Sequence, residues 1–196
     1  MARPGFVILL AFLGEGVLAL AGLLWILIRR VPFSLGDPTT GTIVGLTTAV
    51  ALAAIQYVLL HHAPPVRPVR ALRRMYRSFL RPLFRRVTPL EIVAISLLAG
   101  LGEEILFRGA IQPEWGWFAA SVLFGLCHVG SRTTIVLGIW AALTGGLLGW
   151  LAIATGGLLA PIVAHAVYDA LALSYIRWAR PLPDPDGPAR VESPDL

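Results

Sequence analysis

Three short motifs in this chain place acidic, basic and imidazole side chains inside apolar sequence. The first has Glu103 and Glu104 side by side, followed by Arg108, in the stretch Leu101–Glu114, which otherwise resembles a membrane-spanning helix. An ionised side chain near the centre of a bilayer costs about 2.5–3.5 kcal/mol on insertion scales, and such residues usually pair or line a water-filled cavity. We therefore expect these residues to be functional.

Helical geometry gives the two glutamates different roles. Residues four apart share a face of a helix, whereas neighbours diverge by about 100°. Glu104 can therefore pair with Arg108, and Glu103 points elsewhere and stays free to act as a general base. A purely structural Glu–Arg pair that joins two helices would explain Glu104 and Arg108, but it leaves Glu103 unexplained.

Two histidines and an aspartate form the other two motifs. His128 lies near the end of one apolar stretch, and His165 and Asp169 lie four residues apart in a later one. His165 and Asp169 can act as co-ligands, or as an imidazole and its orienting carboxylate. A lone histidine in a membrane more often makes a buried hydrogen bond than binds a ligand, but two histidines together with Glu103 favour a shared site. Cys127 points about 100° away from His128 and is expected to pack.

The composition is that of an integral membrane protein. Of the 196 residues, 57% are hydrophobic and 14% are charged, which excludes an ordinary soluble globular protein. All 16 basic residues are arginine, and the formal net charge is +5. Because these arginines lie in loops near apolar spans, we expect the lipid bilayer, and no nucleic acid, as the partner. The single cysteine rules out a disulfide within this chain.

The apolar stretches predict an all-α bundle of about six transmembrane helices that encloses a polar intramembrane cavity. A helix needs about 20 apolar residues to cross the hydrocarbon core. The predicted spans are Phe6–Ile28, Thr42–Leu60, Leu90–Ile111, Trp115–Gly130, Thr133–Ala154 and Leu158–Ile176. We divide the chain into two N-terminal helices with a basic loop (residues 1–87), a core with the three motifs (88–178) and a proline-rich tail predicted to be disordered (179–196).

The depth of the polar residues predicts that they meet. At about 1.5 Å per residue from the non-cytoplasmic turns, Glu103, His128 and His165 lie roughly 15, 18 and 12 Å deep. These depths are close to the middle of a hydrocarbon core about 30 Å thick. Three different helices are thus expected to bring polar groups to one level. Glu15 is a further intramembrane carboxylate, whose orientation the sequence leaves open.

The basic loop sets the expected topology. Its segment 66–86 carries eight arginines, at positions 67, 70, 73, 74, 77, 81, 85 and 86. It is expected to form an amphipathic helix on an anionic leaflet, a topology-setting loop, or both. The positive-inside rule makes it cytoplasmic, and six spans then place both termini in the cytoplasm of what we expect to be a bacterial plasma membrane. Arg29 and Arg30 then lie on the non-cytoplasmic side of the membrane, which counts against this topology.

The motifs resemble those of the CAAX-processing and bacteriocin-processing intramembrane proteases. That family shares the signatures Glu-Glu-x-x-x-Arg, Phe-x-x-x-His and His-x-x-x-Asn/Asp on separate transmembrane helices. This chain has them in the same order, over residues 88–177, as Glu103 to Arg108, Phe124 to His128 and His165 to Asp169. Each motif alone is weak, but the ordered set is a strong signal.

The resemblance implies a helical bundle with a conical water-filled cavity and hydrolysis of membrane-associated or lipidated peptides. Glu103 would be the base that activates water, with His128 and His165 binding that water or a metal ion. Glu104 and Arg108 would support them. Zn²⁺ or another divalent metal would be held by Glu103, His128, His165 and Asp169.

One position departs from the family pattern. Many members have asparagine where this chain has Asp169, and an ionised aspartate cannot donate a hydrogen bond to an oxyanion. Asp169 is therefore expected to bind metal or to orient His165. Which residue would donate a hydrogen bond to the oxyanion is left open. Arg108 is a candidate if its N–H donors are not all taken by Glu104.

Two other classes of function compete with the protease. A catalytically silent binding or immunity protein of the same fold would keep its phenotype without Glu103. A small transporter or proton relay would also use intramembrane Glu, His and Asp, but the chain shows no obvious inverted repeat of the kind many transporters have. The sequence specifies neither the substrate nor the oligomeric state.

Overall fold

The computed structural model describes residues 4–179 and residue 182, and this part of the chain contains helices and no strand. The predicted all-α class is therefore confirmed. The elements are α1 (Pro4–Arg29), α2 (Pro38–His61), α3 (Arg67–Met75), η1 (Tyr76–Leu80), α4 (Arg81–Phe84), α5 (Pro89–Glu104), η2 (Ile105–Ile111), α6 (Gln112–Trp115), α7 (Trp117–Cys127), η3 (Arg132–Thr134), α8 (Ile135–Ala154) and α9 (Leu159–Trp178). Of these, η1 and η2 are π-helical and η3 is a 3₁₀-helix.

Four helices in the described part of the chain are long and apolar enough to cross a membrane. Their spans are Ala11–Arg29, Pro38–His61, Arg132–Ala154 and Leu159–Trp178. They correspond to the first, second, fifth and sixth predicted spans. Large apolar side chains such as Leu27 and Leu143 are exposed on their outer faces, which suits contact with lipid. An integral membrane protein is thus confirmed.

The other two predicted spans have a different form. α5, η2 and α6 make one helical run from Pro89 to Trp115, which contains the predicted third span. α7 has only 11 residues, because Gly116, with φ +86°, breaks the helix before it and His128 ends it. The predicted fourth span, Trp115–Gly130, is therefore too long for the helix that forms, and the count of six spans stays a prediction.

Capping fixes the start of α5 and hence the place of the two glutamates. Glu91 Oε2 accepts a hydrogen bond from the backbone nitrogen of Thr88 (2.6 Å), and Thr88 Oγ1 accepts one from the backbone nitrogen of Glu91 (3.3 Å). Pro89 occupies the first turn, where its missing N–H costs nothing. With its start fixed in this way, α5 carries Glu103 and Glu104 in its last turn.

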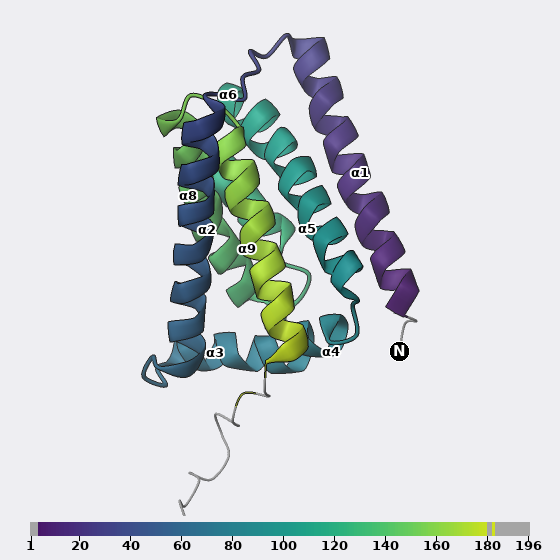
Figure 1. Cartoon of the computed structure of the whole chain (residues 1–196), viewed down its shortest axis with the longest axis vertical. Coiled ribbons are helices and arrows are strands. Elements are labelled where there is room, and N and C mark those ends of the chain that lie inside the picture. Colours follow the sequence, from purple (N-terminus) through teal and green to yellow (C-terminus); the bar gives the residue numbers. More distant parts are fainter. Residues whose placement is uncertain (1–3, 180–181, 183–196) are drawn as a thin grey trace, which may run out of the picture.

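α9 lies at the centre of the bundle. It packs against α2, α5 and α8, and α1 covers the far side of α5 (Figure 1). Glycines allow the close approach: a Cβ on Gly45 of α2 would lie 2.7 Å from the Cβ of Val163, and one on Gly100 of α5 would lie 2.8 Å from the Cβ of Ala166. Small residues at helix crossings are a common means of tight packing in membranes.

The basic segment folds as a helix across one end of the bundle (Figure 1). The helical part of the expectation is thus confirmed, but the apolar face of this helix packs on the protein. Tyr76 is buried in a cluster with Leu60 and Ile176. Arg73 closes the end of α2 by donating to the carbonyl oxygens of Leu60 (2.9 Å) and Ala63 (2.7 Å). Contact with an anionic leaflet stays a prediction.

The predicted proline-rich tail, residues 179–196, lies outside the described residues except for residues 179 and 182.

The crossing of α5 and α9 predicts a stability difference between two glycines. We expect Gly100→Ala to lower the free energy of unfolding by about 1–3 kcal/mol, because its methyl group would press on the backbone of Ala166. Gly14→Ala is the matched control, since no atom lies within 4 Å of a Cβ there. It should be neutral or slightly stabilising. Unfolding in detergent micelles measures both, and equal effects would contradict the packing argument.

Candidate active site

A buried carboxylate joins two of the predicted site residues. Glu104 is 0% exposed, and its Oε1 accepts hydrogen bonds from Nη1 of Arg108 (2.7 Å) and from Nδ1 of His165 (2.7 Å). The predicted pair of Glu104 and Arg108 thus forms, and the same oxygen also binds the imidazole from α9. Because Nδ1 is engaged by Glu104, the ring presents Nε2 to the rest of the site.

Arg108 is engaged by the protein from two sides. Its Nη1 is bound to Glu104, and its Nη2 donates to the carbonyl oxygen of Gly145 on α8 (2.9 Å). The guanidinium carbon lies 4.4 Å from the centre of the Phe124 ring, which favours a cation–π contact. Arg108 is only 3% exposed. It therefore serves to hold Glu104, α7 and α8 in place.

Glu103 faces the other side of the same imidazole. Its Oε2 lies 3.7 Å from Nε2 of His165, beyond hydrogen-bonding distance. This oxygen is buried and has no hydrogen-bond partner among the described residues. Asp169 Oδ2 lies 3.6 Å from the same Nε2. One imidazole nitrogen thus faces two carboxylates, and the carboxylate that binds His165 directly is Glu104, not Asp169.

His128 is the predicted residue that stands apart. It ends α7, and its Nδ1 lies 2.8 Å from the carbonyl oxygen of Phe124, which it therefore contacts as a donor. The Phe124 ring packs against both histidines, with its centre 4.8 Å from that of His128 and 5.9 Å from that of His165. His128 shares a pocket with the other site residues but makes no hydrogen bond or ion pair with them.

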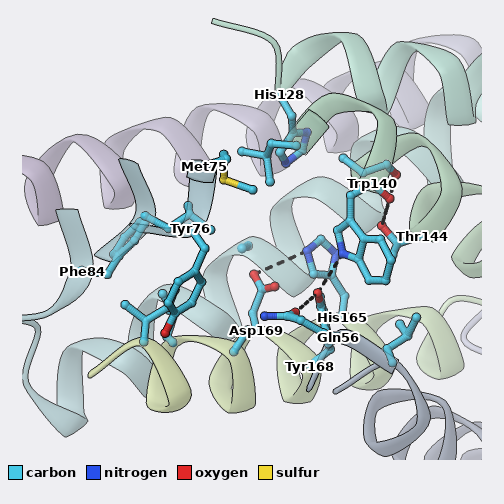
Figure 2. A pocket seen from close by; sticks show the side chains of 18 of the residues that line it. Gln56, Met75, Tyr76, Phe84, His128, Trp140, Thr144, His165, Tyr168 and Asp169 are labelled. Atoms are coloured by element: carbon cyan, nitrogen blue, oxygen red, sulfur yellow. Dashed lines mark hydrogen bonds and ion pairs between the residues drawn. The ribbon is translucent and has the colours of Figure 1, made fainter. Parts of the chain in front are cut away.

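The pocket has a volume of about 370 Å³ and is mainly apolar. Its polar side chains gather in one region, where Figure 2 shows His165, Asp169, Tyr168 and Gln56 together. Another part of its wall is the basic segment, which contributes Met75, Tyr76 and Phe84 (Figure 2). A mainly apolar pocket therefore contains a small cluster of acidic and imidazole groups.

The predicted metal site was tested against this geometry. Among residues 4–179 and 182, no three His, Cys, Asp or Glu side chains form a group arranged to hold a metal ion. Glu104 occupies one nitrogen of His165, and Phe124 occupies one nitrogen of His128. Metal binding by Glu103, His128, His165 and Asp169 therefore stays a prediction.

The structure adds residues that the motifs missed. Glu15 of α1 lines the pocket with a buried, unpartnered Oε2, and its backbone oxygen would lie 2.6 Å from a Cβ on Gly102. Gln56 of α2 lines the pocket as well. Both are polar residues inside apolar spans, and that signal was present in the sequence. What the sequence lacked was the packing of α1 and α2 against the core.

Fold and geometry define an all-helical membrane protein with a buried Glu–Arg–His cluster at a pocket. Residues 85–171 match the Rce1-like family, described as type II CAAX prenyl endopeptidase Rce1-like. This segment contains all three motifs. The resemblance drawn from the motifs is confirmed.

A curated relative and the solved structures add little more. The chain is 32% identical over 98 residues to an uncharacterized protein, YpbD, of Bacillus subtilis strain 168. The match covers 50% of this chain and 52% of the relative, so the chain spans about half the length of that protein. No solved structure matches the chain.

The buried pair predicts a large effect on stability. We expect Arg108→Leu to lower the free energy of unfolding by about 3–5 kcal/mol, because Glu104 would keep a buried charge without its cation. The matched control is Arg29→Leu. Arg29 pairs with Glu114 at 2.9 Å, but its side chain is 64% exposed, so its loss should cost at most about 1 kcal/mol. Chemical unfolding of the purified protein compares them, and similar losses would contradict the structural role of Arg108.

Proposed function

We propose that this protein is an intramembrane endopeptidase that cleaves membrane-associated or lipidated peptides with a water activated by Glu103. The observation that carries this proposal is the Glu103 carboxylate, buried beside Nε2 of His165 with a partnerless oxygen. A general base has to reach the proton that it removes. Glu103 and His165 line one pocket. The Rce1-like family supports a protease of this class.

The proposed reaction is the hydrolysis of one peptide bond. Glu103 Oε2 takes a proton from water as the water oxygen attacks the carbonyl carbon, and the carbonyl electron pair moves to oxygen. When the tetrahedral intermediate collapses, the C–N bond breaks and Glu103 returns the proton to the leaving amine. His165 Nε2, 3.7 Å from Glu103 Oε2, is near enough to hold the same water. The products are a carboxylic acid and an amine, which exchange a proton to become a carboxylate and an ammonium group.

Glu104 and Arg108 act as positioning residues in this scheme. The bond from His165 Nδ1 to Glu104 fixes the tautomer and the orientation of the ring, so that Nε2 faces Glu103. Arg108 balances the charge of Glu104. The two adjacent glutamates thus have different duties because only one of them is paired.

The pocket favours an apolar substrate. Leu52, Ile95 and Leu173 line it together with the apolar face of the basic segment. A lipid-bearing or apolar peptide would bury its surface there at about 25 cal/mol per Å² of apolar area. The description of the matching family, type II CAAX prenyl endopeptidase, makes a peptide that ends in S-prenylcysteine and three further residues a suitable first probe.

Replacement of Glu103 tests the proposal. In proteoliposomes with a fluorogenic S-farnesylated peptide, we expect Glu103→Gln to lower kcat by about 10²–10⁴-fold, because the amide cannot take the proton. Glu114→Gln is the matched control, since Glu114 pairs with Arg29 outside the pocket. A Glu103→Gln protein that cleaves at the normal rate would contradict the proposal and favour a binding protein. Elemental analysis of the same samples, with His165→Ala beside them, tests the metal prediction.

We further propose that the end of the bundle with the basic segment faces the cytoplasm of a bacterial plasma membrane. Arg81 Nη1 donates to the carbonyl oxygen of Ala179 (2.9 Å), so the end of α9 lies there too. Figure 1 places the start of α1 at the same end. The positive-inside rule supports this orientation, and the Bacillus subtilis relative supports a bacterial membrane.

Cysteine labelling tests the orientation. In a Cys127→Ala background, a membrane-impermeant maleimide should label Thr39→Cys in intact cells, because Thr39 is exposed at the opposite end. The exposed Ser78→Cys, on the basic segment, should react only after the cells are opened. The reverse pattern would show that the basic segment is extracytoplasmic.

A further inference from the structure

Peptide hydrolysis needs a donor for the developing oxyanion, and most donors at the polar end of the pocket are already engaged. Arg108 donates to Glu104 and Gly145. Thr144 Oγ1 donates to the carbonyl oxygen of Trp140 (3.0 Å). His128 uses Nδ1 on Phe124, so in the neutral ring its other nitrogen accepts. Asp169 cannot donate when it is ionised.

A chain of hydrogen bonds holds one further side chain at this end of the pocket. Trp140 Nε1 donates to the hydroxyl of Tyr168 (2.8 Å), which donates to Oε1 of Gln56 (Figure 2). An indole N–H can only donate, so the Tyr168 hydroxyl accepts there and directs its own hydrogen to Gln56. The amide oxygen of Gln56 is therefore occupied, and its Nε2 keeps both N–H donors.

The free amide group of Gln56 points into the pocket. No other hydrogen bond of Gln56 forms within the described part of the chain. Gln56 lines the pocket together with Glu103, His165 and Asp169, and Figure 2 shows its amide at the same end of the pocket as Tyr168, His165 and Asp169. Tyr168, its anchor, directly precedes Asp169 on α9. An oriented neutral N–H donor thus lines the same pocket as Asp169.

We propose that Gln56 is the oxyanion donor of this protein, with Nε2 donating to the oxygen of the scissile carbonyl as the water attacks. This inference rests on the proposed endopeptidase activity. No bond to Gln56 forms or breaks: the carbonyl electron pair moves to oxygen, the N–H stabilises it, and the pair returns when the C–N bond breaks. Gln56 lies on α2, outside the segment that matches the family.

Packing gives Gln56 the rigidity that such a donor needs. Its helix lies against α9, where Gly45 allows close approach to Val163. Tyr168 and Trp140 then fix the amide from α9 and α8. A donor that is already oriented costs no reorganisation during the reaction, which is why such groups are effective.

The test measures kcat and KM for the S-farnesylated peptide in proteoliposomes. We expect Gln56→Met to lower kcat about 100-fold with KM changed by less than threefold, because the oxyanion exists only in the transition state. Gln56→Glu should show a similar loss, since it keeps an acceptor for Tyr168 but has no amide N–H. Tyr168→Phe should lose less, because it loosens the amide without removing it.

Gln112→Met is the matched control. Gln112 also sits in a long helical run and donates from Nε2 to a helix carbonyl, that of Gly149 (3.0 Å), but it does not line this pocket. Its kcat should stay normal. If Gln56→Met does not fold, Gln56→Glu decides the matter. A normal kcat in a folded Gln56 variant, or an equal loss of kcat in Gln112→Met, would overturn the role of Gln56 and leave the proposed function standing. Absence of cleavage by the intact protein would overturn the proposed function with it.

Discussion

The site depends on one buried oxygen, Oε1 of Glu104. It accepts a hydrogen bond from Arg108 of the same helical run and another from His165 of α9, each at 2.7 Å. A fully buried carboxylate is strongly unfavourable without such partners, so α5 and α9 have to stay in register for the fold to be stable. The same bonds decide which nitrogen of His165 faces the pocket. The same oxygen atom therefore stabilises the fold and orients His165.

The neighbouring Glu103 shows how environment assigns different roles to identical side chains. It lacks the cation that Glu104 has, and its Oε2 stays without a partner in an apolar wall. Such an atom is costly for folding, and proteins keep such costs mainly at functional sites. Arg108 pairs with Glu104, and Glu103 is left to face His165.

The sequence predicted the parts of the site that follow from spacing within one helix. The pairing of Glu104 with Arg108 came from their separation of four, and the meeting of Glu103 with His165 came from similar depth. It could not show that Glu104 also binds His165, because that contact depends on how α5 and α9 cross. It also missed the π-helix η2, which follows Glu104 directly. Such a widened turn is frequent at functional sites and has no simple sequence signal.

The pocket is built from two parts of the chain. The residues of the three motifs lie within residues 85–171, the segment that matches the family. Much of the pocket wall comes from elsewhere: Glu15 from α1, Gln56 from α2, and Tyr76 and Phe84 from the basic segment. These residues meet the core through close packing at Gly45 and Gly102 and through the chain of bonds from Trp140 to Gln56. The segment that matches the family thus supplies Glu103, His165 and Asp169, and the preceding helices line much of the rest of the pocket.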